Sequence, residues 1–184
     1  MRVISGELKG RRLNRIDTDS IRPTSDKVKE ALFSILGDLV IDSNFLDLFA
    51  GSGSVGIEAY SRGAREVVFV DSHLSSIRIL KKNLEKIDIL KETEVLFNDY
   101  ATAIKILSKQ GRKFDIIFID PPYEQGLSLE AIRKILDVKL LAKNGVIVVE
   151  HGIKEILPEE IDILERFKVK KYGNVFLSLY AIKK

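Results

Sequence analysis

The sequence predicts a single α/β domain in which helices cover both faces of a mostly parallel sheet. Five short apolar segments expected to be strands alternate with four segments of helical periodicity: residues 45–49, 66–70, 94–97, 114–119 and 145–150 for the strands, and 54–62, 73–86, 101–109 and 127–137 for the helices. This alternation is typical of βαβ units, whose parallel strands are buried on both faces. A chain of 184 residues, 45% of them hydrophobic, suffices for one such domain.

The last part of the chain departs from this alternation. Residues 161–169 and 175–182 both have the composition of strands, and only five residues separate them. So short a connection indicates a hairpin, and we expect the last strand to run antiparallel to its neighbour.

The first part of the chain is also distinct. Residues 2–15 are expected to form a short hairpin with turns at Gly6 and Gly10. Two short strands are not stable alone, so this hairpin must pack on the main domain or become ordered on a ligand. We expect a basic hairpin and loop over residues 1–23, followed by the main domain over residues 24–184.

A further helix opens the main domain. Thr24 or Ser25 is expected to cap it, apolar residues recur at helical spacing, and Gly37 ends it.

Composition excludes several classes of chemistry. The chain has no cysteine, which excludes disulfides, cysteine zinc sites and cysteine nucleophiles. With His73 and His151 as its two histidines, we expect no metal site. The N-terminus lacks the apolar stretch of a secretory signal, and no apolar run is long enough to cross a membrane. A cytoplasmic location is the expectation.

Positive charge is concentrated near the N-terminus. The net charge of the whole chain is only +3, yet residues 1–15 hold five basic side chains, opposed by Glu7 alone. These five are Arg2, Lys9, Arg11, Arg12 and Arg15. Such a segment on a near-neutral body favours contact with a polyanion, and a merely solvated arm is the alternative.

The first predicted strand runs into a glycine-rich turn that opens a helix. The run from Gly51 through Gly53 to Gly56 fits the G-x-G-x-x-G pattern, in which a ligand approaches the backbone at a helix N-terminus. The pattern alone does not identify one cofactor.

Acidic and amide side chains follow the next two strands. Asp71 follows the second strand, 20 residues after Gly51, where an acid accepts hydrogen bonds from ribose hydroxyls. Asn98 and Asp99 follow the third, within reach of an adenine amino group. Both positions also suit helix caps, and Asp71 could serve in both ways.

The fourth predicted strand, 114–119, ends at Asp120-Pro121-Pro122-Tyr123. Two prolines cannot donate ladder hydrogen bonds, and each residue before a proline is held extended. A stiff corner therefore presents a carboxylate, a carbonyl and an aromatic ring at the edge where open α/β sheets bind ligands.

The order of these motifs resembles the class I S-adenosylmethionine-dependent methyltransferases. Asp-Pro-Pro-Tyr is similar to the signature of those that methylate exocyclic amino groups of bases. Three further segments resemble the RsmD family, bacterial 16S ribosomal RNA (guanine(966)-N(2))-methyltransferases. They are R-V-I-S-G-x-L-K-G-R-x-L from Arg2, R-P-T-S-D-x-V-K-E-A-L-F from Arg22, and the late Glu150-His151. This resemblance covers essentially the whole chain.

The resemblance implies a Rossmann-like, seven-stranded sheet of order 3-2-1-4-5-7-6 with its last strand antiparallel. It also implies S-adenosyl-L-methionine as cofactor, held by Asp47, Phe49, Gly51, Gly53, Asp71, Ser72, Asn98 and Asp99. Arg22, Pro23 and Thr24 are expected to cover the methionine end of the cofactor or the target base. The basic residues Arg2, Lys9, Arg11, Arg12 and Arg15 are expected to contact RNA phosphates.

A catalytic role for the corner follows from the chemistry of an exocyclic amine. Its lone pair is delocalised into the ring, so alignment and exposure of the lone pair are the main tasks. Asp120 and the Pro121 carbonyl can each accept a hydrogen bond from one N–H group of the amine. Pro122 stiffens the corner, and Tyr123 can stack on the base. Asp120 or solvent could take the proton. Glu150 and His151 could line the base pocket or only end a strand.

Other functions fit parts of this pattern. One is an adenine-N6 or cytosine-N4 DNA methyltransferase, although the chain lacks room for a large target-recognition domain. A nucleotide-dependent oxidoreductase would need a separate substrate domain, and a non-catalytic RNA-binding module would not need the tetrapeptide. The expected partner is 16S ribosomal RNA, within a partly assembled 30S particle, and a monomer is the expected state.

Overall fold

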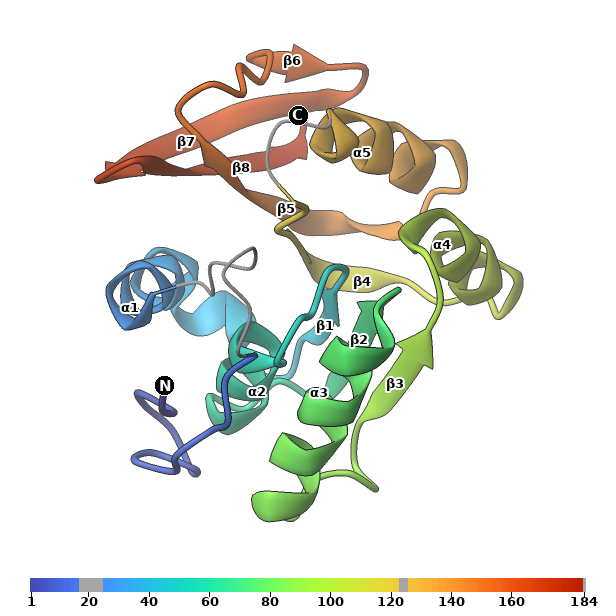
Figure 1. Cartoon of the computed structure of the whole chain (residues 1–184). Helices are drawn as coiled ribbons and strands as arrows, with labels where there is room; N and C mark the ends of the chain where they lie inside the picture. The colour runs from blue at the N-terminus through green and yellow to red at the C-terminus, as the bar shows by residue number, and fades with distance from the viewer. Residues whose placement is uncertain (17–24, 123–125, 184) are drawn as a thin grey trace.

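One twisted sheet forms the centre of the molecule, with helices on both of its faces (Figure 1). The structure, a computed structural model, describes residues 1–16, 25–122 and 126–183. Within these residues eight strands pair in the order β3-β2-β1-β4-β5-β8-β7-β6. Their bounds are Asn44–Asp47 (β1), Glu66–Asp71 (β2), Glu94–Phe97 (β3), Phe114–Ile119 (β4), Leu141–Gly152 (β5), Glu160–Ile161 (β6), Leu164–Tyr172 (β7) and Val175–Ile182 (β8).

The sheet confirms the predicted class and corrects the strand count. Strands β1 to β5 are parallel, and β8 pairs antiparallel with β5 and β7, as expected for the last strand. The sixth predicted strand, 161–169, divides in two because the chain turns at Asp162, whose φ is 52°. This turn pairs the two-residue β6 with β7. Without β6 the strand order is the predicted 3-2-1-4-5-7-6.

The helices lie close to the predicted segments. Their bounds are Asp26–Leu36 (α1), Ser54–Ser61 (α2), Leu74–Lys86 (α3), Tyr100–Lys109 (α4) and Leu127–Asp137 (α5), and a 3-10 turn, η1, covers Gly37–Val40. Ser25 caps α1 by accepting a hydrogen bond from the Val28 N–H at 3.2 Å. β5 begins four residues before the predicted strand, at Leu141.

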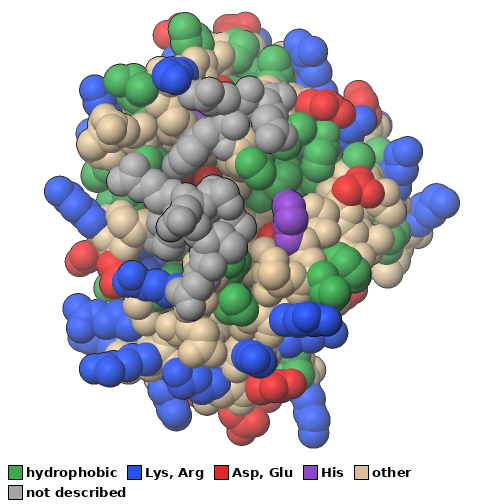
Figure 2. All heavy atoms as spheres, in the orientation of Figure 1, with side chains coloured by type: hydrophobic (Ala, Val, Ile, Leu, Met, Phe, Trp, Pro, Cys, Tyr) green, Lys and Arg blue, Asp and Glu red, His purple; other side chains and the backbone are tan. Residues whose placement is uncertain are grey.

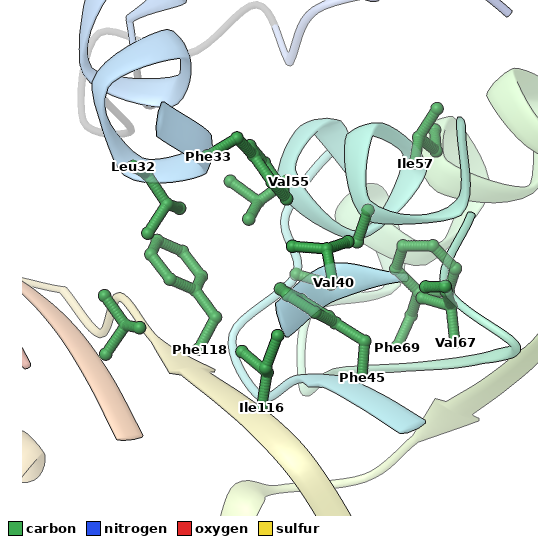
Figure 3. Close-up of a cluster of buried hydrophobic side chains, with 14 of the residues drawn as sticks. Leu32, Phe33, Val40, Phe45, Val55, Ile57, Val67, Phe69, Ile116 and Phe118 are labelled. Carbon is green, nitrogen blue, oxygen red and sulfur yellow. The ribbon is translucent and has the colours of Figure 1, made fainter. Parts of the chain in front are cut away.

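Two apolar cores lie on opposite faces of the sheet. Helices α1, α2 and α3 pack on one face, where Leu32 and Phe33 of α1 and Val55 of α2 meet Phe45 and Phe118 of the sheet (Figure 3). Helices α4 and α5 cover the other face. Burial on both faces explains the near-continuous apolar composition of the central strands. In the described part of the chain, no helix combines the length and the apolar content needed to cross a membrane.

The N-terminal segment, residues 1–16, forms a hairpin-like loop on the α1–α3 face. Its ladder is reduced to a single antiparallel bridge between Arg2 and Arg12, with backbone bonds from the Val3 N–H to the Arg11 carbonyl and from the Leu13 N–H to that of Met1 (both 3.0 Å). Val3 and Leu13 are buried in the core of this face, so the segment leans on the main domain. The proposed domain boundary at residues 23 and 24 lies outside the described residues.

Candidate active site

The glycine-rich turn between β1 and α2 uses its three glycines differently. A Cβ on Gly56 would lie 2.3 Å from Cε1 of Phe69, and one on Gly53 would lie 2.3 Å from Cδ1 of Leu80, so these two allow close packing of the turn and helix. Gly51 has a φ of 56°, and a Cβ added there would lie 3.8 Å from its nearest described neighbour, Cδ1 of Ile16. Of the three glycines, Gly51 therefore has the most room around its Cα among the described residues, as the approach of a ligand to the backbone would require.

The Asp71 carboxylate joins this turn to the end of β2. Its Oδ2 accepts a hydrogen bond from the Gly51 N–H and its Oδ1 accepts one from the His73 N–H, both at 2.8 Å. Asp71 is buried, and the next residue, Ser72, is exposed. The N-cap of α3 is His73, with no side-chain cap bond, so Asp71 is not the helix cap weighed as an alternative. Its carboxylate ties the residue that begins the helix to the turn and keeps lone pairs for further donors at the strand end.

Asp47 lies beneath the turn rather than on its surface. It is 1% exposed, and its Oδ2 accepts a hydrogen bond from the Gly56 N–H at 2.9 Å. Burial raises the pKa of Asp47 to about 7, opposed by the Gly56 bond and reinforced by the Asp71 charge. Asp47 therefore anchors the first turn of α2, and direct contact with a ligand would require its carboxylate to be exposed.

Replacing Asp47 with Asn should remove a pH dependence of stability. An acid with a raised pKa in the folded state holds its proton more tightly when folded, so the free energy of unfolding falls as pH rises from about 4 to about 7. The contribution is at most about 4 kcal/mol, from about three pKa units. Urea denaturation across this range should show a steeper fall for the native protein than for Asp47→Asn. In the matched control Asp99→Asn, which changes an exposed carboxylate of lowered pKa, the fall above pH 4 should persist.

Two more candidate residues follow β3. Asn98 donates its backbone N–H to the Asp71 carbonyl at 3.2 Å, which ties the ends of β2 and β3 together. Asp99 caps α4 by accepting hydrogen bonds from Thr102 N–H at 2.9 Å and from Thr102 Oγ1 at 2.7 Å, and these bonds lower its pKa. The cap alternative is confirmed for Asp99, whose side chain is nevertheless exposed.

An aromatic pair lies between these strand ends. The ring of Phe49, which follows β1, lies 5.4 Å from the ring of Tyr100 at the start of α4. Burial raises the pKa of Tyr100 to about 12, helped by its hydrogen bond to Glu130. Phe49, a predicted cofactor contact, is thereby held at the edge where β1, β2 and β3 end.

The Asp-Pro-Pro corner directly follows β4. Asp120 is half-buried, Pro121 is buried and Pro122 is exposed. In the parallel ladders Asp47 of β1 is level with Phe118 of β4 and Phe69 of β2, so Asp120 and Asp71 each follow by two residues at the same edge. Tyr123, Arg22, Pro23 and Thr24 lie outside the described residues.

His151 sits inside the structure at the end of β5. Its Nδ1 lies 3.0 Å from the Glu155 carbonyl, which can only accept, so Nδ1 donates and Nε2 accepts from Ser178 Oγ at 2.9 Å. Burial lowers its pKa, and its ring stacks on Phe176 at 5.5 Å. These contacts favour the structural alternative for His151. Glu150 beside it is also buried.

Three buried polar side chains to which the motifs gave no role hold the N-terminal segment. Glu58 of α2 accepts hydrogen bonds from the Ile4 N–H at 2.8 Å and the Ser5 N–H at 3.0 Å. Lys29 of α1 donates to the Arg2 carbonyl at 2.8 Å, and its Nζ lies 3.6 Å from Glu58 Oε2. The third, Asn83 of α3, bonds to Asn14. In the sequence each of the three is a polar residue within a helical segment. Ordinary solvent-exposed residues look the same, so the pattern did not mark them as buried.

The five predicted RNA-contact residues all point away from the core. Arg2, Lys9, Arg11, Arg12 and Arg15 are exposed. Figure 2 shows Lys and Arg side chains gathered at the lower left, the side on which the N-terminal segment lies in Figure 1. The structure therefore places a basic surface beside the glycine-rich turn.

Strand order, glycine-rich turn and Asp-Pro-Pro corner together define a class I S-adenosylmethionine-dependent methyltransferase. Comparison with known proteins agrees. A solved structure titled "Putative methyltransferase yhhF from Escherichia coli" superposes with a TM-score of 0.85 at 33% identity, covering 100% of this chain and 98% of that one.

Sequence comparison identifies the family. The family model described as "Conserved hypothetical protein 95" matches residues 1–181. "Putative rRNA methyltransferase YlbH" of Bacillus subtilis is 40% identical over 181 residues, 98% of each chain. "Ribosomal RNA small subunit methyltransferase D" of Escherichia coli K12 is 34% identical, over 98% of this chain and 89% of that protein. The chain belongs to this family, the RsmD family of methyltransferases.

Proposed function

We propose that this protein transfers a methyl group from S-adenosylmethionine to the exocyclic N2 of a guanine, of the 966 type, in 16S ribosomal RNA. The observation that carries the proposal is the meeting of the Gly51 turn, Asp71 and the Asp120 corner at one sheet edge. The names of the relatives favour ribosomal RNA as substrate, and the basic surface beside this edge suits a polyanion.

The residues at the edge fit the proposed cofactor. The open side of Gly51 lets a ligand approach the backbone at the start of α2, and the Asp71 carboxylate stands where ribose hydroxyls would donate. Phe49, Ser72, Asn98 and Asp99 stand around the same strand ends, and Asp47 supports them from below. When bound, the cofactor supplies an electrophilic methyl group.

The Asp120 corner acts on the amine. The Asp120 carboxylate and the Pro121 carbonyl each accept a hydrogen bond from one N–H group of the amine. These two hydrogen bonds pull the nitrogen toward tetrahedral geometry and expose its lone pair. Pro121 and Pro122 hold the backbone still, so little reorganisation is needed during transfer. The amine loses one proton after the new N–C bond forms, and this proton passes to Asp120 or to solvent. Tyr123 stacks on the base.

Methyl transfer from radiolabelled cofactor is the direct test. Naked 16S RNA and 30S particles are incubated with the protein, and the labelled nucleoside is identified after digestion. We expect label on N2-methylguanosine, with more of it on the 30S particles than on naked RNA. Label on N6-methyladenosine, or on DNA alone, would contradict the guanine assignment and favour the DNA methyltransferase alternative.

Reversing two charges of the basic surface should weaken RNA binding selectively. The double variant Arg11→Glu, Arg12→Glu places acids where phosphate contacts are proposed, and both side chains are exposed. We expect RNA affinity to fall by tenfold or more at low salt, with a smaller salt dependence, because each lost phosphate contact lowers the salt slope by about 1. Cofactor affinity, measured by calorimetry, should stay within about twofold. The matched control is Lys81→Glu, Lys82→Glu on α3, two exposed lysines outside the segment.

The setting of the reaction is part of the same proposal. We expect the enzyme to act in the cytoplasm, as a monomer, on a partly assembled 30S subunit. Sedimentation of the purified protein tests the monomer, and a dimer at micromolar concentration would contradict it.

A further inference from the structure

Asn83 is a fully buried amide on α3 that the proposed chemistry does not use. It is 0% exposed and makes three hydrogen bonds. Its Oδ1 accepts from the Asn14 N–H at 2.7 Å, and its Nδ2 donates to the Asn14 carbonyl at 3.2 Å and to the Ser52 carbonyl at 2.9 Å. A buried side chain with all of these bonds made is costly to displace.

The two partners of Asn83 belong to different parts of the machinery. Asn14 lies in the N-terminal segment between Arg12 and Arg15, whereas Ser52 lies between Gly51 and Gly53 in the glycine-rich turn. One side chain therefore joins the backbone of the basic segment to the backbone of the turn.

Two neighbouring contacts join the same parts. The Ile16 side chain lies over Gly51, 3.8 Å from the position of an added Cβ. Ser52 Oγ lies 3.7 Å from the Met1 sulfur, a weak donor–acceptor contact. The Gly51 side of the turn is thus bordered by the N-terminal segment, which contacts the turn through Met1 and Ile16.

We propose that Asn83 is a positioning residue that locks the basic segment onto the glycine-rich turn, so that cofactor and RNA each strengthen the binding of the other. This inference rests on the proposed function, because it takes residues 1–16 as an RNA contact and the turn as the cofactor site. Cofactor at Gly51 orders the turn, Asn83 transmits that order to Asn14, and the flanking arginines meet RNA already in place. Coupling of this kind is reciprocal.

Hydrogen exchange tests the lock without any RNA. In the native protein, S-adenosylhomocysteine should slow amide exchange across residues 13–16. Asn83→Leu keeps a similar volume in the core but loses all three hydrogen bonds, and it should abolish this effect of the ligand. Unchanged exchange in the native protein on adding S-adenosylhomocysteine would overturn the coupling.

Binding and kinetics test the consequence. S-adenosylhomocysteine should tighten the binding of transcribed 16S RNA to the native protein by at least about fivefold, the lower end of ordinary coupling, and should leave it unchanged in Asn83→Leu. The KM for RNA should rise in this variant while kcat is retained, a split that general loss of stability does not produce. Retained coupling in Asn83→Leu would overturn the inference.

Two controls separate the inference from the proposed function. In Asn14→Ala, S-adenosylhomocysteine should still slow exchange across residues 13–16 and tighten RNA binding by the same factor as in the native protein, because Asn83 hydrogen-bonds to the backbone of Asn14. Loss of this coupling would count against the positioning role. If reversing Arg11 and Arg12 leaves RNA binding unchanged, the RNA role of the segment fails while the exchange result still stands. If that reversal weakens RNA binding but Asn83→Leu keeps its coupling, the positioning role alone fails.

Discussion

Asp120→Ala should lower the rate of methyl transfer by about 10²- to 10⁴-fold, the range expected when a group that acts in the transition state is removed. The loss follows because the target amine would keep its lone pair in the ring and would lack one of its two acceptors. Cofactor affinity should change little, since the Gly51 turn and Asp71 are held by bonds that do not involve Asp120. Single-turnover transfer and calorimetry with S-adenosylhomocysteine measure the two effects separately.

Asp115 provides the matched control on the same strand. It lies on β4, five residues before Asp120, and its Oδ2 accepts a hydrogen bond from the Asn44 N–H at 2.8 Å. Asp115→Asn should leave the transfer rate within about twofold. Asp120→Asn retains one acceptor and should fall between Asp120→Ala and the native enzyme. Full activity in Asp120→Ala would make Asp120 a structural residue.

Glu58→Ala should destabilise the protein by about 3–5 kcal/mol, the cost of breaking a buried ion pair on one side. Glu58 and Lys29 are each 0% exposed, so the ammonium of Lys29 would lose its closest anion without reaching water. The Ile4 and Ser5 N–H groups would lose their acceptor as well. At about 2–4 °C per kcal/mol for a chain of this size, the midpoint of thermal unfolding should fall by about 10 °C.

The pH dependence of the Glu58 variants supplies an independent check. Burial lowers the pKa of Lys29, and the attraction of Glu58 opposes this shift. Where the folded pKa is lowered, the unfolded chain binds more protons between that pKa and 10.5, so the free energy of unfolding rises with pH in this window. Glu58→Gln removes the opposing attraction and lowers the pKa of Lys29 further, so its stability should begin to rise at a lower pH and rise by more in total than that of the native protein. Glu30→Ala, at an exposed position beside Lys29, should change stability by less than about 0.5 kcal/mol.

The sequence carried the strand–helix alternation and the motifs at strand ends because each depends on a few neighbouring residues. The periodicity of 114–119 and the glycines after residue 50 fix local structure whatever surrounds them. The division of 161–169 was missed because an aspartate with positive φ is a turn that composition does not reveal.

The buried polar contacts that hold the N-terminal segment were not predictable for a different reason. Lys29, Glu58 and Asn83 act through contacts with residues more than 20 positions away. Only the fold brings such partners together. Similarly, the resemblance implied Asp47 as a cofactor contact, but its hydrogen bond to the Gly56 N–H beneath the turn depends on how β1 and α2 pack, which the motif alone does not give.

The way in which residues 1–16 are held has a consequence for their evolution. Glu58, Lys29 and Asn83 form hydrogen bonds with main-chain groups of the segment rather than with its side chains. The main-chain groups belong to Arg2, Ile4, Ser5 and Asn14. At exposed positions this attachment therefore does not depend on which side chain is present. Val3 and Leu13, which are buried in the core, are exceptions, and so is Gly6, where a Cβ would lie 1.7 Å from the Ser61 carbonyl oxygen. Exposed positions such as 9, 11 and 12 can vary without weakening this attachment, so the strength of the proposed RNA contact can drift, or be engineered, while the catalytic scaffold stays unchanged.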